Sequence, residues 1–412
     1  MSGGRILIFT ASHLCRNPRV VKEATTLGAA GYEVTVLTAS VSPRFAQLDQ
    51  QLLGGLPFRC AALDQASPSI TRFTQRAATW MARRLGRLGV ESAQALGPAQ
   101  ALLHRARKFR ADLTIVHTEI PLWAAQFLIR DGRRVAVDFE DWHSEDLLAA
   151  DRSGRPLQLL RHAEEFALRR CAYASATSQS MADALSAAYH CPPPLVLRNS
   201  FPLSPRSRLD RDAPAAPPRL IWFSQTIGPG RGLEEFIAAW ALTKHQSRIA
   251  LLGDVRADFR DFLFARVPPE RRNAVDFLPP VPPGELPDGL THFDIGLALE
   301  LATPRNRDVT ITNKILQYLN AGLAVLATGT AGQREILAAA PAVGALISLD
   351  DRAGLVRQLD ALLESPGRLR AMQTAARAAA EREFCWEHEA PKLLAAVEGA
   401  LANPPPGISP RS

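Results

Sequence analysis

The sequence predicts two α/β domains, each built around a parallel β-sheet and joined by one proline-rich linker. The chain has 412 residues, more than a single hydrophobic core usually serves. Short apolar runs alternate with helical patterns in both halves, which is typical of a parallel sheet covered by helices on both faces. Proline and arginine dominate residues 191–220, where this pattern is interrupted once.

The first domain is expected over residues 1–200. It opens with a strand, a helix and a second strand, at the length of a right-handed parallel crossover. The strands are predicted at residues 5–10, 32–38, 111–118, 133–140 and 175–180, with the first helix at residues 20–31.

The second domain is expected over residues 201–383, where the same alternation restarts. Strands are predicted at residues 220–225, 248–253, 274–281, 293–300 and 323–328, with helices at residues 233–244 and 313–321. Each strand has the apolar character of a buried parallel strand. A last amphipathic helix covers about residues 384–402, and the tail at residues 403–412 is expected to be disordered because it is rich in proline and polar residues.

Composition limits the classes of function. A hydrophobic content of 47% and a charged content of 22% indicate an ordinary globular protein, and the net charge of +7 suits phosphorylated ligands, an anionic membrane or nucleic acid. Nucleic acid ranks low because the sequence has no aromatic-stacking or helix-turn-helix signature. Five scattered cysteines without a C-x-x-C pair favour a reducing, cytoplasmic compartment, and nine histidines without a zinc-like spacing predict no metal. The chain opens on a strand rather than a signal peptide, and no apolar run is long enough to span a bilayer.

Residues 70–110 have two interpretations. Phe73 and Trp80 share an apolar helical face, while Arg76 and Arg83 share a basic one. The simpler interpretation is a solvated helix. The alternative is a basic amphipathic helix that meets an anionic membrane surface.

Two strand–helix junctions of the second domain are candidate phosphate sites. One has Gly230 and Gly232 around Arg231, where backbone N–H groups, a helix dipole and a guanidinium converge. It lacks the G-K-[ST] of a Walker loop, and an ordinary turn is the alternative. The other begins the helix at residue 313, and its candidate ligands are Thr310, Thr312, Asn313 and Lys314.

Lys314 is unusual because a cation in the first turn of a helix is disfavoured by the dipole. A bound diphosphate would reverse that preference, whereas a solvent-exposed lysine with a small penalty is the alternative. Thr310 or Thr312 could cap this helix.

Acidic residues end one strand of the first domain. Asp138, Glu140 and Asp141 are candidates for acid–base chemistry because the carboxyl ends of parallel strands carry the binding sites of such sheets. Helix capping by acids is the alternative. In the second domain, a polar loop follows a strand and could bind sugar or phosphate through Glu300, Arg305, Asn306 and Arg307.

The order and spacing of several stretches resemble the retaining glycosyltransferases of the GT-B fold (the large family four or group 1 type), which use nucleotide-activated sugars. The matching stretches are "NPRVVKEATTLGAAGYEVTVLT", "ATSQSMADAL", "VLRNSFPL", "SQTIGPGRGLEEFIAAW", "LGD" and "TNKILQYLNAGLAVLATGTAGQREIL". The resemblance covers nearly the whole chain. It implies two Rossmann-like domains facing a cleft, with the final helix packing back on the first domain.

The resemblance also implies roles for residues. Arg231 and Lys314 match positions that bind the donor diphosphate, and Asp138, Glu140 and Asp141 match a D-x-H-E stretch in which Glu140 stands in the place of the histidine. Arg16 and Asn17 lie in the acceptor-side loop. Two glutamates of many relatives correspond to Val309 and Gln317, and an arginine of relatives corresponds to Gln225. Gln317 is then expected to hold the ribose, with Gln225, Glu300, Arg305 and Asn306 near the nucleoside and sugar.

The expected function is transfer of a sugar, a hexose in the simplest case, from a nucleotide-diphosphate sugar to an acceptor hydroxyl, with retention and without a metal or other cofactor. The acceptor is a glycan, a lipid-linked molecule or a small molecule. Two alternatives remain open: a nucleotide-sugar epimerase of the same fold, and a non-catalytic subunit that binds the nucleotide sugar.

Overall fold

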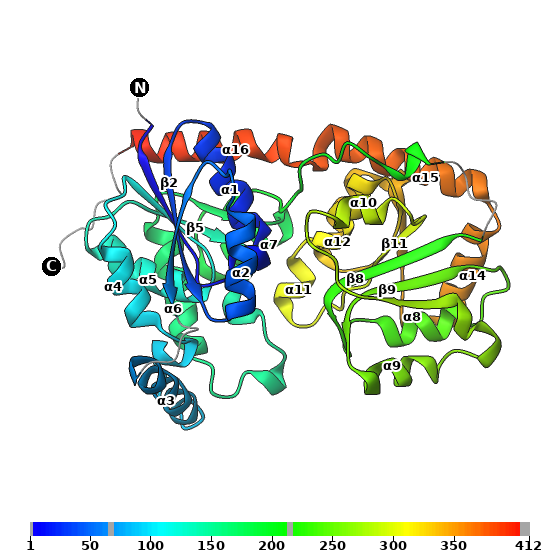
Figure 1. The fold of residues 1–412 in the computed structure, drawn as a ribbon, viewed down its shortest axis with the longest axis horizontal. Helices are drawn as coiled ribbons and strands as arrows, with labels where there is room; N and C mark the ends of the chain where they lie inside the picture. The colour runs from blue at the N-terminus through cyan, green and yellow to red at the C-terminus, as the bar shows by residue number, and fades with distance from the viewer. Residues whose placement is uncertain (1–2, 65–69, 212–216, 404–412) are drawn as a thin grey trace. The chain divides into compact units, whose positions relative to one another are not determined.

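The computed structural model describes residues 3–64, 70–211 and 217–403, and it divides the chain into two compact units. Unit 1 contains the chain up to Leu197 together with the residues from Ala390 onward, and unit 2 runs from Arg198 to Glu389. Both units are α/β, each with one parallel sheet, as the sequence predicts (Figure 1). Except for Asn403, the tail expected to be disordered lies outside the described residues.

The sheet of unit 1 has seven strands in the order β3-β2-β1-β4-β5-β6-β7, all paired in parallel. Its strands are β1 (Arg5–Phe9), β2 (Glu33–Ser40), β3 (Arg59–Asp64), β4 (Leu113–Val116), β5 (Val135–Phe139), β6 (Ala174–Ala176) and β7 (Leu195–Val196). Its helices are α1 (Pro18–Ala29), α2 (Pro43–Leu52), α3 (Ile70–Gly86), α4 (Ala99–Arg107), α5 (Glu119–Arg130), α6 (Leu157–Arg170) and α7 (Gln179–Tyr189).

The sheet of unit 2 has six parallel strands in the order β10-β9-β8-β11-β12-β13. Its strands are β8 (Arg219–Ile227), β9 (Arg248–Val255), β10 (Val275–Leu278), β11 (Ile295–Ala298), β12 (Ala324–Thr328) and β13 (Gly344–Ile347). Its helices are α8 (Leu233–Trp240), α9 (Ala257–Phe264), α10 (Leu286–Leu290), α11 (Arg305–Val309), α12 (Asn313–Ala321), α13 (Ala331–Ala339), α14 (Arg352–Leu363) and α15 (Pro366–Ala379), and α16 (Trp386–Ala402) closes the chain.

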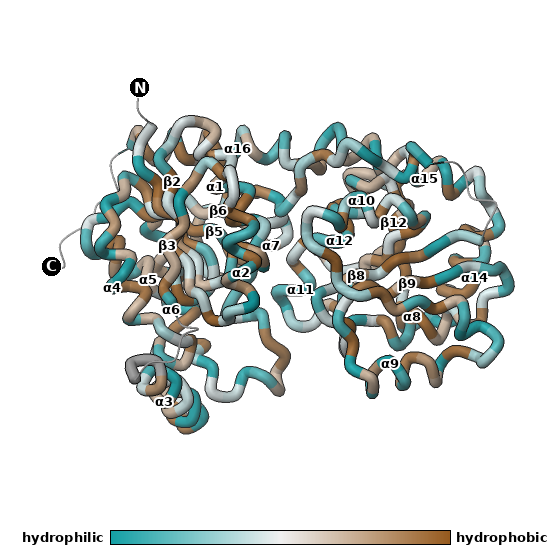
Figure 2. Tube along the Cα trace, viewed as in Figure 1, coloured by the Kyte–Doolittle hydropathy of each residue, from teal (hydrophilic) through white to brown (hydrophobic). Residues whose placement is uncertain are grey.

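The strands are buried because both faces of each sheet are covered. In β1, Ile6 and Leu7 are each 1% exposed, and every residue of β5 and β11 is buried. Figure 2 shows apolar residues gathered along the strands of each unit, with polar residues on the outer helices. This pattern is typical of parallel sheets, and it explains why the central strands were predictable from apolar runs.

Contacts between Tyr318 and β11 fix α12 against the sheet of unit 2. Gly296 of β11 lies under the Tyr318 ring, where an added Cβ would come within 2.2 Å of a ring carbon. The Tyr318 hydroxyl is fully buried and lies 3.2 Å from the carbonyl oxygens of Ile221 and Leu297. These contacts hold α12 against β8 and β11.

The structure contains elements that the sequence analysis did not predict. Half of the residues of the edge strand β3 are exposed and the other half are only partly buried, so β3 lacks the continuous apolar run of its neighbours. The first helix begins at Pro18 rather than Val20, because the Asn17 side chain accepts a hydrogen bond from the Val20 N–H and caps it. Among the described residues, no helix is both long and apolar enough to cross a membrane.

Candidate functional site

In each sheet the strand order reverses at one point, and polar residues gather at the carboxyl ends of the strands there. The reversal lies between β1 and β4 in unit 1 and between β8 and β11 in unit 2. Ligands of open α/β sheets bind outside the carboxyl ends of strands at such a point. We describe the cluster of each unit by itself.

Lys314 and Glu300 form the centre of the cluster in unit 2. Lys314 Nζ donates to Glu300 Oε1 at 2.7 Å, and the two side chains are only 9% and 7% exposed. Thr312 lies at the N-cap of α12, but its hydroxyl donates to Glu300 Oε1 at 3.2 Å instead of capping the helix. The alternative interpretation of Lys314 as a solvent-exposed lysine is therefore wrong, because Lys314 is buried and pairs with a carboxylate that follows β11.

Two arginines add positive charge around Glu300. Arg307 donates to the Gly230 carbonyl at 3.0 Å, and its Nε lies 3.9 Å from Glu300 Oε2. Burial raises the pKa of Glu300, but the charges of Lys314, Arg231 and Arg307 outweigh it and leave that pKa below its ordinary value. Glu300 is therefore a carboxylate surrounded by three cations.

The glycine-rich turn of β8 comes close to this cluster through Gly230. Gly230 and Gly232 both have positive φ, at 70° and 73°, which explains glycine at these positions. The Gly230 N–H, however, donates to Glu234 Oε1 at 3.1 Å. This donor reaches a phosphate only after the Glu234 side chain moves away.

The remaining predicted residues of unit 2 are arranged in three ways. Gln317 is 4% exposed, and its Oε1 finds no donor among the described residues. Thr310 bonds back to Asn306, and Asn313 Oδ1 accepts from Asn199 at 2.9 Å. The side chains of Gln225 and Arg305 are exposed.

Glu140 is the centre of the cluster in unit 1, just after β5. Its Oε1 accepts from Asn17 Nδ2 at 2.9 Å and lies 2.7 Å from His117 Nδ1. The Glu140 side chain is 17% exposed, and Oε2 has no hydrogen-bond partner among the described residues. One oxygen of this carboxylate is fixed and the other is available to a ligand.

Asp138 faces the interior rather than solvent. Arg19 donates to both of its oxygens, at 2.9 and 2.5 Å, and Ser175 donates to Oδ2 at 2.7 Å. The residue is 2% exposed. We therefore place Asp138 among the residues that support the cluster rather than those that contact a substrate.

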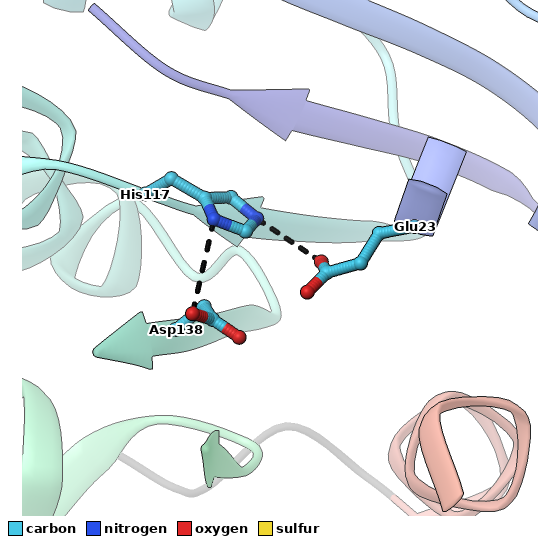
Figure 3. Close-up of side chains that lie close together, drawn as sticks. All are labelled: Glu23, His117 and Asp138. Carbon is cyan, nitrogen blue, oxygen red and sulfur yellow. Dashed lines mark ion pairs between the residues drawn. The ribbon is translucent and has the colours of Figure 1, made fainter. Parts of the chain in front are cut away.

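His117 lies between Glu23 and Asp138 in unit 1 (Figure 3). It follows β4, and its Nε2 lies 3.2 Å from Glu23 Oε2 of α1 while its Nδ1 lies 3.9 Å from Asp138 Oδ1 of β5. Burial lowers the pKa of His117, but the Glu23 charge and the Glu140 hydrogen bond raise it to about 10. Burial raises the pKa of Glu140, but the hydrogen bond to His117 outweighs burial. The pKa of Glu140 therefore lies below its ordinary value.

Glu23, His117 and Asp138 lie close enough together to be tested as a metal site. Arg19 Nε already lies 3.2 Å from Glu23 Oε1, and its guanidinium bonds to Asp138. A divalent ion would stand beside that buried cation, and His117 would have to give up a proton. The residues fit an internal charge network better than a metal ion.

His117, Arg19 and Glu23 were not predicted from the sequence. His117 could have been found, because it follows β4 as Glu140 follows the adjacent β5. Arg19 and Glu23 lie in a helix whose sequence is amphipathic. Only the fold shows that these two charged residues are on its buried face. Of the predicted residues, the structure brings Asn17 and Glu140 together in unit 1. In unit 2 it brings Thr312, Lys314 and Glu300 together, and Arg307 links Gly230 to them.

Comparison with protein families assigns each half of the chain. Residues 19–200 match the model described as Glycosyltransferase Family 4, and residues 231–395 match the model described as Glycosyl transferase-like. The chain thus contains two regions that match glycosyltransferase models. The first contains His117 and Glu140, and the second contains Arg231, Lys314 and Gln317.

Solved structures share the fold of this protein over nearly the whole chain. Anabaena HepE in complex with UDP-glucose has a TM-score of 0.68 and 17% identity, covering 96% of this chain and 99% of that one. A glycosyltransferase from Rickettsia africae has a TM-score of 0.68 and 13% identity, covering 98% and 100%. S. aureus TarM, in complex with fondaparinux, α-GlcNAc-glycerol and UDP, has a TM-score of 0.66 and 8% identity, covering 97% and 100%. The fold of the chain is thus GT-B. No curated protein matches the chain in sequence.

Proposed function

We propose that the protein transfers a sugar, a hexose in the simplest case, from a nucleotide-diphosphate sugar to an acceptor hydroxyl, with the donor held in unit 2. The observation that carries this proposal is the convergence of Lys314, Arg231 and Arg307 at the carboxyl ends of β8 and β11. Three cations against the carboxylates of Glu300 and Glu234 leave a positive site. Such a site stabilises negative charge that grows on a leaving diphosphate, which is electrostatic catalysis.

Gln317 supports binding of the nucleoside next to this diphosphate site. It lies three residues after Lys314, so both side chains project from the same face of α12. Leaving its carbonyl buried without a donor costs about 1–3 kcal/mol, and a ribose hydroxyl would supply that donor. We propose that Gln317 binds the ribose.

Unit 1 is proposed to bind the acceptor. Glu140 presents Oε2 as a free acceptor atom for a hydroxyl, and Asp141 is the next residue along the chain. Arg16 lies in the same loop as Asn17, with its guanidinium 5.1 Å from the centre of the Phe45 ring. The resemblance to retaining enzymes supports transfer with retention, and the three cations of unit 2 support leaving-group stabilisation that needs no metal.

A ligand screen followed by an activity assay tests this function. UDP-glucose and UDP-N-acetylglucosamine are the first probes, because HepE was solved with UDP-glucose and TarM with UDP and a GlcNAc-glycerol. A donor should raise the melting temperature, since a ligand that binds only the folded state stabilises it. Adding glycerol or a glycan acceptor should then release UDP and form a glycoside whose anomer NMR identifies.

Each alternative gives a different result in the same experiment. An epimerase converts the nucleotide sugar without an acceptor and releases no glycoside. A binding subunit shows the thermal shift with no turnover in any mixture. Absence of a shift with all nucleoside diphosphates and their sugars would contradict the proposal.

We also propose that α3 and the residues after it contact an anionic membrane, which would place a cytoplasmic enzyme at a lipid surface. Phe73, Trp80 and Leu88 are 76%, 58% and 80% exposed. Of the 48 basic and 41 acidic residues of the chain, residues 70–110 hold nine basic and one acidic, so this segment accounts for the positive net charge. Exposed apolar side chains beside uncompensated arginines fit acidic phospholipids. The side chains of residues 70–72, Arg72 among them, lie outside the described part of the structure.

Charge reversal tests the membrane contact. The double variant Arg76→Glu/Arg87→Glu should reduce binding to vesicles that contain phosphatidylglycerol by at least about tenfold, since each basic residue near the surface contributes about 1 kcal/mol. Arg83 is left intact because it donates to the Ala95 carbonyl at 3.0 Å. Sedimentation with vesicles measures the binding.

The matched control reverses two exposed arginines of unit 2, as Arg352→Glu/Arg368→Glu, with the same change in net charge. It should retain vesicle binding. Equal losses in both double variants would show that net charge alone, and not the α3 surface, drives the association.

A further inference from the structure

We propose that His117 is a positioning residue, held as an imidazolium between Glu23 and Glu140, which fixes Glu140 as a carboxylate with only Oε2 directed to the substrate. This inference rests on the proposed acceptor role of Glu140. It adds a second requirement, that the acceptor side of the reaction depends on a buried positive charge that contacts no substrate.

The contacts of the imidazole ring carry the first step. Nδ1 lies 2.7 Å from Glu140 Oε1, and Nε2 lies 3.2 Å from Glu23 Oε2. A neutral imidazole has one N–H and one lone pair, so one of the two carboxylates would face a lone pair. With both nitrogens protonated, each nitrogen attracts the carboxylate that it faces.

The other charged groups around His117 favour the same state. Asp138 lies 3.9 Å from Nδ1, and the charge of Arg19 is balanced by its ion pairs with Glu23 and Asp138. With His117 charged, three carboxylates face two cations, whereas a neutral His117 would leave three carboxylates with one cation in a region where only Glu140 is partly exposed. Burial and the Asp138 charge raise the pKa of Glu23, and the charges of His117 and Arg19 oppose that rise. The Tyr173 phenol interacts with Glu23 and Asp138 and stays neutral, because burial raises its pKa.

The consequence for Glu140 is a fixed geometry. His117 and Asn17 both donate to Oε1, so the carboxylate can rotate only by breaking two hydrogen bonds. Oε2 then remains as the oxygen of an ionised carboxylate that no described residue holds, in a side chain that is 17% exposed. Such an oxygen can orient an acceptor hydroxyl, or it can stabilise positive charge on the transferred sugar.

Titration of the histidines by NMR, on protein labelled in the imidazole ring, tests the charge directly. The His117 signal, assigned by its loss in His117→Asn, should remain that of an imidazolium up to about pH 10. Glu23→Gln removes the facing charge at nearly constant shape and should shift this titration to lower pH by at least one unit. A wild-type His117 that is neutral at pH 8 would overturn the proposal.

Stability provides an independent reading with a fixed sign. Because the folded pKa lies above the ordinary value of 6.5, the stabilisation is complete below about pH 6.5 and is lost as pH rises through about 10. The urea midpoint of the wild type should therefore approach that of His117→Asn between these limits. A constant difference between the two proteins would contradict the charged state.

Turnover separates positioning from a purely structural role. His117→Asn keeps a donor near Glu140 and should retain more kcat than His117→Ala, with KM for the donor unchanged in both. In Glu23→Gln the alkaline limb of the kcat profile should move with the NMR titration. If His117 shifts and the kcat profile does not move, the positioning role is refuted. If no transfer is found at all, titration of the Glu140 carboxyl still tests the positioning. The pKa of Glu140 should then be higher in His117→Asn than in the wild type.

Discussion

Replacing Lys314 by methionine should weaken binding of UDP by about 10- to 100-fold while leaving binding of uridine unchanged. The variant removes a cation whose hydrogen bond to a charged group contributes about 1.5–3 kcal/mol, and the nucleoside lacks the diphosphate that needs it. Isothermal titration calorimetry with UDP and with uridine measures the difference. In the wild type, Lys314 Nζ lies 5.2 Å from the centre of the Trp222 ring. Methionine is chosen because it keeps an apolar side chain of similar length beside this ring.

Glu300 complicates this experiment and also supplies its control. Without Lys314, its buried carboxylate keeps only the more distant arginines, so the single variant should also lose stability. Lys314→Met/Glu300→Gln should recover that stability without recovering UDP affinity. Lys244→Met, at an exposed lysine of the same unit, should change neither quantity. Recovery of UDP binding in the double variant would show that Lys314 acts only by neutralising Glu300.

Replacing Arg19 by methionine should destabilise unit 1 by about 3–5 kcal/mol. The guanidinium is fully buried between Glu23 and Asp138 and also donates to the Leu197 carbonyl at 2.9 Å. Removing it leaves two buried carboxylates without their main counter-charge, which is the costly way to break a buried ion pair. Chemical unfolding followed by circular dichroism measures the loss.

Two further variants show whether the cost comes from the uncompensated charge. Arg19→Met/Glu23→Gln/Asp138→Asn should recover most of the stability, because it removes the charges that the arginine balances. Arg5→Ala breaks an ion pair with Asp112 in which the two side chains are 48% and 40% exposed, so it should cost far less than Arg19→Met. Equal losses from Arg19→Met and Arg5→Ala would contradict the account.

The fold was predictable where burial imposes a pattern on the sequence. The central strands are apolar on both faces, so runs such as Arg5–Phe9 and Ala324–Thr328 were identified, and the alternation with helices gave the parallel topology. The edge strand Arg59–Asp64 was missed because half-exposed residues carry no such run. The GT-B architecture came from the resemblance, since spacing alone does not distinguish it from other paired α/β domains.

The candidate site was predictable only in part, for a related reason. Glycines and cations at a strand–helix junction are visible in the sequence, so Gly230 and Lys314 were identified. Glu300 and Glu140 were also identified, but His117 and both pairings were not, because the bond from Lys314 to Glu300 and the contact between His117 and Glu140 join separate loops. Pairing of that kind depends on which strands become neighbours in the sheet, and no local pattern records it.

Asn17 limits which substitutions this protein can tolerate. Its Oδ1 caps α1 through the Val20 N–H, while its Nδ2 donates to Glu140. Aspartate would cap the helix equally well but would place a second negative charge against Glu140, and serine would cap without reaching it. Only an amide of this length does both tasks, so exchange of residue 17 and exchange of residue 140 should occur together in divergent relatives. A helix cap, usually a replaceable feature of a fold, is here tied to the identity of a single carboxylate.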